Sequence, residues 1–132
     1  MGTYYKVSIN SRSNRDFHPQ IKIVLEKVNQ EMSTYIEDSL ISQFNRHPPN
    51  TWFKVSDSFM DVFLKSIEIC NLSNGYFDVT VGKVVDAWGF GPLTETETPD
   101  SREMEDALSH VSCKAVIQDK NNNYLKKINP VS

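Results

Sequence analysis

An apolar stripe with helical spacing in the middle of the chain restricts the fold most. Residues on one face of this segment are Phe59, Val62, Phe63, Ile67 and Cys70. Apolar residues that recur every three or four positions share one side of an α-helix. Ser58 and Asp61 match a capping box at its start, and Asn74-Gly75 is typical of a helix end. The sequence therefore predicts a buried helix that ends near residue 73.

Other segments predict further helices around this one. Apolar residues repeat at helical spacing after Pro19, which suits a first turn, up to about Ser33. Ser39–Phe44 predicts a short helix capped by Asp38 or Ser39, and Lys83–Trp88 predicts another. A fifth helix opens at 99–101, where Asp100 and Glu103 form a predicted cap pair.

Short extended runs alternate with these helices. Tyr4–Ile9 and Thr51–Val55 read as extended, and Ala115–Ile117 and Tyr124–Ile128 predict a hairpin around an asparagine turn. With 132 residues and no internal repeat, the chain fits one domain. The order of elements predicts an α+β fold, with a mixed sheet and several helices packed on it.

Composition excludes several classes of function. The net charge is −3 and the basic residues are scattered, so no nucleic-acid partner is expected. No apolar run approaches the ~20 residues of a membrane span, and no secretory h-region follows Met1. Cys70 and Cys113 lie far apart among apolar neighbours. We expect them to be buried core thiols, although a disulfide between them stays open because it depends on geometry.

Three segments carry possible chemistry. They are Met1-Gly2-Thr3-Tyr4-Tyr5; Met32–Ser39 with Ile41–Asn45; and Gly75–Gly82 with Trp88–Pro92. Each has a local explanation as a strand, a helix cap, or a helix stop with core aromatics. Glycines beside aromatic rings and a carboxylate also permit a ligand to approach the backbone closely and to stack on the rings.

In this order and spacing, the segments resemble the MGTxY, MSTYxxDSxxSxFN and G-[AY]-FD-x-TVG…WGFGP signatures of the FAD:protein FMN transferases, the ApbE family. The resemblance extends from Met1 to about Val111. It implies an ApbE-like, T-fold-related domain. We expect residues 1–132 to be the truncated, N-terminal part of one such domain, because the last hairpin runs into the terminus without a closing element.

The resemblance also implies a reaction. Family members bind FAD in a cleft and use a divalent metal, usually Mg²⁺, to transfer FMN to a Ser or Thr hydroxyl of a target protein, with release of AMP. Some relatives instead hydrolyse FAD, as a pyrophosphatase. The positions that match family FAD contacts are Met1, Tyr35, Tyr76, Phe77 and Asp78. Tyr76 departs from the alanine usual there, and no catalytic residue is assigned.

No metal ligand is assigned within this chain. The resemblance implies that the Mg²⁺ ligands belong to a later, C-terminal part. The acidic residues from Glu95 to Asp106 are expected to be a solvated face, and the three histidines are scattered. An alternative hypothesis is therefore a truncated paralogue that binds flavin or a partner without catalysis. The resemblance further implies a periplasmic or inner-membrane lipoprotein, and exposed sheet edges predict self-association.

Overall fold

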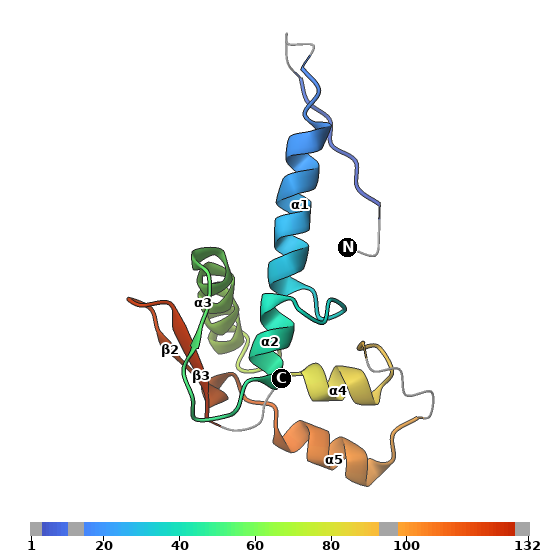
Figure 1. Cartoon of the computed structure of the whole chain (residues 1–132). Coiled ribbons are helices and arrows are strands. Elements are labelled where there is room, and N and C mark those ends of the chain that lie inside the picture. The colour runs from blue at the N-terminus through green and yellow to red at the C-terminus, as the bar shows by residue number, and fades with distance from the viewer. Residues whose placement is uncertain (1–3, 11–14, 93–97, 129–132) are drawn as a thin grey trace.

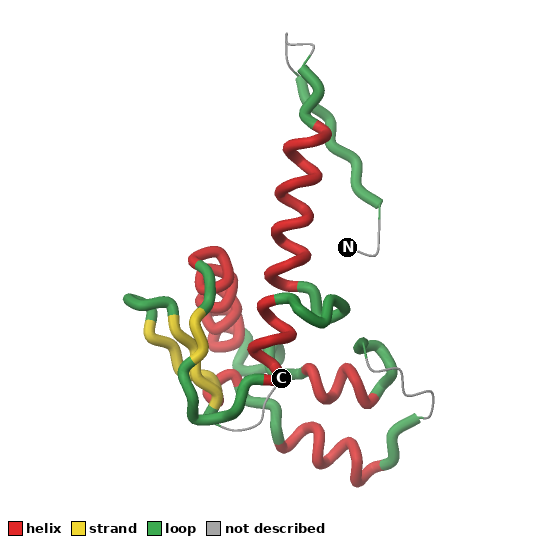
Figure 2. Tube along the Cα trace, viewed as in Figure 1, coloured by secondary structure: helices red, strands yellow, loops and turns green. Residues whose placement is uncertain are grey.

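The computed structural model describes residues 4–10, 15–92 and 98–128. Its helices and strands, in chain order, are α1 (His18–Met32), α2 (Leu40–Arg46), β1 (Phe53–Lys54), α3 (Asp57–Leu72), α4 (Gly82–Ala87), α5 (Ser101–Ser109), a 3-10 turn (Cys113–Ala115), β2 (Val116–Asp119) and β3 (Tyr124–Lys127). Every predicted helix is present, with ends shifted by a few residues. The α+β class is confirmed (Figures 1 and 2).

The core forms where α2 and α3 meet the sheet. Its buried residues are Phe44, Val55, Phe59, Met60, Phe63, Ala115, Val116 and Leu125. The predicted stripe of α3 is therefore largely correct, but Met60 is buried while Val62 is 51% exposed. Lys127 is also buried here; its ammonium donates to the Asn45 carbonyl oxygen at 2.6 Å, and burial lowers its pKa.

The described sheet has three strands in the order β1-β3-β2, and all of its pairings are antiparallel rather than mixed. The predicted hairpin is β2 and β3, with Asn123 in the left-handed conformation at its turn. The strand predicted at Tyr4–Ile9 is wrong, because this segment is exposed and forms no ladder with any described strand. Alternating side chains favour an extended backbone, but a strand also needs a neighbouring strand with which to form hydrogen bonds.

The structure tests three of the helix caps that the sequence predicts. Ser39 caps α2, and its Oγ accepts a hydrogen bond from the Ser42 backbone. Asp100 and Glu103 form the predicted capping box of α5. The capping box predicted on Ser58 is wrong, because α3 starts earlier: extended Ser56 is the N-cap and accepts from the Phe59 N–H at 3.1 Å.

Helix α1 projects away from the sheet, whereas α4 and α5 lie side by side at the opposite end of the molecule (Figure 1). No residue of α1 is buried, and Ile23, Val24 and Val28 are exposed along it. In the part of the chain that the structure describes, no helix combines the length and apolarity that a membrane span requires.

Candidate functional site

Tyr35 joins two of the sequence motifs. Its hydroxyl donates a hydrogen bond to the Phe90 carbonyl oxygen at 2.9 Å, across 55 positions of sequence. Tyr35 itself is 71% exposed, so its ring remains accessible to solvent while its hydroxyl is hydrogen-bonded. The MSTY segment and the WGFGP segment therefore belong to one surface.

The hydroxyl residues around Tyr35 shape the turn that presents it. Ser39 is fully buried and its Oγ donates to the Ser33 carbonyl oxygen at 2.6 Å. Because the same Oγ also accepts from the α2 backbone, one side chain closes the turn and caps the helix. The local capping interpretation of this serine is thus correct, and the turn that it closes presents the exposed ring of Tyr35.

The turn after α3 presents two more aromatic rings. Asn74 and Gly75 both have positive φ, at 53° and 84°, and the Gly75 N–H donates to the Cys70 carbonyl oxygen. This arrangement ends α3 as the sequence predicts. Tyr76 is 98% exposed and Phe77 is 42% exposed. Both rings are available at the surface for stacking on a planar ligand.

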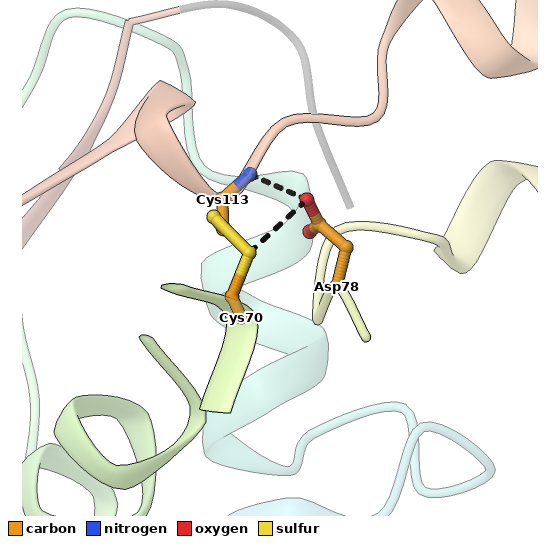
Figure 3. Close-up of side chains that lie close together, drawn as sticks. All are labelled: Cys70, Asp78 and Cys113. Carbon is orange, nitrogen blue, oxygen red and sulfur yellow. Dashed lines mark hydrogen bonds between the residues drawn. A yellow bond between two sulfur atoms is a disulfide. The ribbon is translucent and has the colours of Figure 1, made fainter. Parts of the chain in front are cut away.

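Asp78 fastens this turn to the segment after α5 (Figure 3). Its Oδ1 accepts from the Thr80 N–H at 2.8 Å and from the Thr80 hydroxyl at 2.7 Å. Its Oδ2 accepts from the Cys113 N–H at 2.6 Å. The Thr80 hydroxyl accepts in turn from the Ser112 N–H at 2.8 Å. Both carboxylate oxygens therefore have partners within the chain, and the ligand contact predicted for Asp78 stays a prediction.

A disulfide between Cys70 and Cys113 reinforces the same junction, with the two Cα atoms 6.7 Å apart. The expectation of two unpaired core thiols is wrong. Cys70 is indeed buried, but the last turn of α3 lies against the segment after α5, which brings the second sulfur to it. Spacing in the sequence carried no sign of this pairing, because 43 positions separate the two residues.

A cavity of about 170 Å³ lies between the MSTY segment and the Gly75–Gly82 segment. Thr34 of the MSTY segment lines it on one side, and Val79, Thr80 and Gly82 line it on the other. Its remaining wall is mainly apolar and comes mostly from α2 and α3, with Met32 of α1 and Val116 of β2. Pockets for drug-sized ligands usually measure about 300–1,000 Å³, so this one fits a ring and not a whole dinucleotide.

The WGFGP segment packs back on α4 through its glycines. Gly89 has a positive φ of 71°, and its N–H donates to the Asp86 carbonyl oxygen. Gly91 is buried, and any Cβ there would overlap the Asp86 carboxylate. Partial burial raises the pKa of Asp86. Sequence reasoning missed Asp86, although the second glycine of the motif signals a close neighbour.

The predicted site residues have different outcomes. Met1 lies outside the described residues. Tyr35, Tyr76 and Phe77 lie on exposed turns, and Asp78 follows them in sequence as a partly buried residue. The structure joins Tyr35 to Phe90 and Asp78 to Cys113. Sequence reasoning also missed a cluster: within the described ranges, the one group of three possible metal ligands is Cys70, Asp78 and Cys113.

Comparison with known proteins identifies the family to which this chain is similar. The model of the ApbE family matches residues 1–131. The FAD:protein FMN transferase of Haemophilus influenzae is 40% identical over 74% of this chain and 30% of its own length. That of Escherichia coli K12 is 31% identical over 96% of this chain and 38% of its own length. The chain thus spans less than two-fifths of these curated relatives.

Solved structures agree. The flavin transferase ApbE from Vibrio cholerae superposes with a TM-score of 0.85 at 32% identity, over 92% of this chain and 40% of that one. The flavinyl transferase ApbE of Pseudomonas stutzeri has a TM-score of 0.81 at 23% identity, over 87% of this chain and 38% of that one, which concerns the fold alone. With motifs, family model and fold in agreement, this chain belongs to the ApbE family.

Proposed function

We propose that the chain forms one wall of the flavin site of an FAD:protein FMN transferase. The observation that carries this proposal is the Tyr35–Phe90 hydrogen bond, which joins the MSTY and WGFGP segments on one surface. A cavity large enough for one ring lies beside it, between Thr34 of the MSTY segment and Val79–Thr80. Exposed Tyr35, Tyr76 and Phe77 supply stacking faces for the isoalloxazine or adenine ring. The names of the relatives support the same reaction.

In the proposed reaction, a Ser or Thr hydroxyl oxygen of a target protein attacks the FMN phosphorus of FAD. The bond from that phosphorus to the bridging oxygen breaks, AMP leaves with that oxygen, and the hydroxyl proton is released. Phosphoryl transfer of this kind depends mainly on alignment and on positive charge at the phosphate oxygens. The proposed contribution of this chain is alignment, since it holds the rings of FAD.

The described residues do not fit a Mg²⁺ ion. Magnesium prefers oxygen ligands in octahedral geometry. The described cluster of possible ligands contains two sulfurs and a single carboxylate. The proposed role of the described residues is therefore independent of Mg²⁺. This observation also favours a second candidate, a flavin-binding module that does not catalyse transfer by itself.

Calorimetric titration of the 132-residue chain with FAD, with and without Mg²⁺, separates the two. The binding module predicts an affinity that does not depend on Mg²⁺ and no AMP. The transferase predicts Mg²⁺-dependent binding, followed by AMP release and flavinylation of a Ser/Thr target. Loss of FAD without labelled target would point to hydrolysis. No FAD binding by a folded chain would contradict both candidates.

Two substitutions test the wall itself. Tyr35→Ala removes a ring, and we expect FAD affinity to fall about tenfold, because stacking on an aromatic side chain contributes ~1–3 kcal/mol. Tyr35→Phe keeps the ring and removes only the bond to Phe90, so the loss should be smaller. Tyr124→Phe on β3 is the matched control and should bind as the parent does. Equal affinities for Tyr35→Ala and the control would overturn this assignment.

Placement in the periplasm, as a lipoprotein of the inner membrane, remains part of the proposal. The Cys70–Cys113 disulfide supports an oxidising compartment, where such bonds persist. Fractionation of cells that produce the native gene product, with a lipid-anchor assay, tests it. Recovery in the cytosol with both cysteines reduced would contradict it.

A further inference from the structure

The junction of Cys70, Asp78 and Cys113 has the chemistry of a metal site as well as of a disulfide. One ligand atom from each residue lies within 4.8 Å of the other two. The three come from separate parts of the chain: the end of α3, the turn before α4 and the segment after α5. Cys70 is buried, and the other two residues are partly buried.

We propose that the reduced form of this chain binds a thiophilic divalent ion, typified by Zn²⁺, through Cys70, Asp78 and Cys113. The disulfide and the ion are then alternative occupants of one junction. The sulfurs can serve as ligands only after the bond between them is reduced. Metal binding at this junction does not require flavin binding.

Distances at the junction suit a tetrahedral ion. With Zn–S near 2.3 Å and Zn–O near 2.1 Å, neighbouring sulfur and oxygen ligands lie about 3.6 Å apart. The Cys70 Sγ and the Asp78 Oδ2 lie 3.8 Å apart in the disulfide form. Two zinc-bound sulfurs lie about 3.8 Å apart, a separation that side-chain rotation can reach once the S–S bond is broken.

Asp78 is already oriented for this role. Its Oδ1 is held by the N–H and the hydroxyl of Thr80, and its Oδ2 points to the sulfurs (Figure 3). The Cys113 N–H also donates to Oδ2, whose remaining lone pair is available to an ion. Hydrogen bonds that fix a ligating carboxylate are typical of metal sites in proteins. Three protein ligands leave a fourth position for water.

The reduction balances with a phosphine as reductant. The phosphine gives two electrons to the disulfide and takes an oxygen from water to become a phosphine oxide. The two protons of that water go to the two sulfurs. Binding of the ion then displaces these protons, because the thiolate is the ligand.

Cobalt(II) is the optical probe for the test. The chain is reduced with a phosphine, freed of reductant under anaerobic conditions and titrated with Co²⁺. We expect one equivalent to bind, with thiolate-to-cobalt charge-transfer absorption and the intense visible bands of a tetrahedral ion. One equivalent of Zn²⁺ should then abolish the spectrum. The oxidised chain should show no such absorption.

Asp78→Asn and Asp119→Asn are the matched pair of variants. Asp78→Asn should weaken Co²⁺ binding by tenfold or more and change the visible bands, whereas Asp119→Asn on β2 should bind as the parent does. A reduced chain that stays helical by circular dichroism but binds no Co²⁺ overturns the proposal. Equal affinity and equal spectra for the two variants also overturn it.

A second measurement needs no variant. Zn²⁺ should protect both cysteines of the reduced chain from alkylation, as counted by mass spectrometry. A chelator should restore two alkylations per chain. Equal alkylation rates with and without Zn²⁺ would contradict the site, whatever the fate of the variants.

Discussion

Single side chains hold the candidate site together across long stretches of sequence. Tyr35 reaches Phe90 across 55 positions, and Asp78 reaches Cys113 across 35. Each interaction fixes a turn, which carries groups that a sheet or helix could not expose as fully. The motif residues therefore serve the local fold first, and the rings beside them stay available to a ligand.

Gly75 gives a prediction about backbone conformation alone. A Cβ there would meet nothing within 4 Å, but the φ of 84° disfavours any L side chain. We expect Gly75→Ala to lower the free energy of unfolding by ~1–2 kcal/mol. Gly75→Asn is the control and should lose less, because asparagine tolerates this conformation, as Asn74 shows with its φ of 53°. Thermal unfolding measures both, and equal losses would contradict the explanation.

Asp86 gives a prediction about pH. Burial raises the pKa of its carboxyl in the folded state above the ordinary value of 3.8. The folded chain therefore keeps this proton up to a higher pH than the unfolded chain does. The contribution of Asp86 to stability therefore falls as the pH rises from 3.8 through the folded pKa, and it stays low above that pKa.

Asp86→Asn should remove this dependence. Relative to the variant, the parent should lose stability between acid and neutral pH in urea unfolding. Asp61→Asn on α3 removes an exposed carboxylate and is the control for net charge. A parent that gains stability over Asp86→Asn with rising pH would refute the stated sign.

At the scale of elements, the sequence predicted correctly those helices and turns that depend on residues close together in the chain. The stripe of α3, the capping box of α5 and the asparagine turn of the hairpin all depend on residues a few positions apart. The strand predicted at Tyr4–Ile9 failed because a ladder needs a distant partner. The disulfide and the partners of Asp78 depend on how α3 meets the segment after α5, which no local pattern encodes.

The disulfide predicts a stability that depends on reductant. It closes a loop across 43 positions, for which chain entropy gives up to ~4 kcal/mol and measured bonds typically give ~2–4 kcal/mol. With a chelator present to exclude metal, reduction should lower the free energy of urea unfolding by about that amount. The double variant Cys70→Ala with Cys113→Ala should be indifferent to reductant. A parent equally indifferent to it would show that the bond is absent or contributes no stability.

At the scale of the whole molecule, much apolar surface faces outward. Val62, Ile69 and Leu72 are exposed on α3, as are three residues of α1. Strands β1 and β2 form the two edges of the described sheet. Exposed apolar patches and unpaired strand edges both favour association with other chains. The self-association expected from the sequence therefore remains a proposal with a structural rationale.

Sedimentation velocity over a range of concentrations tests this proposal. We expect the mean sedimentation coefficient to rise with concentration. Ile117→Lys places a charge on the edge strand β2, where Ile117 is 41% exposed, and should weaken the association. Leu108→Lys adds the same charge on α5, away from the sheet, and should not. A single monomeric species at all concentrations would contradict the proposal.

The bond between Cys70 and Cys113 also turns the stretch between them into a covalent ring that contains the most exposed aromatic residue of the α3–α4 turn, Tyr76. A protease that cuts after Tyr76 would open this ring without releasing a piece. The nicked protein would weigh one water more than the intact chain and would migrate as one species until a reductant divides it in two. The parts on both sides of such a cut would stay joined through the disulfide, whereas a cut outside the ring would detach part of the protein.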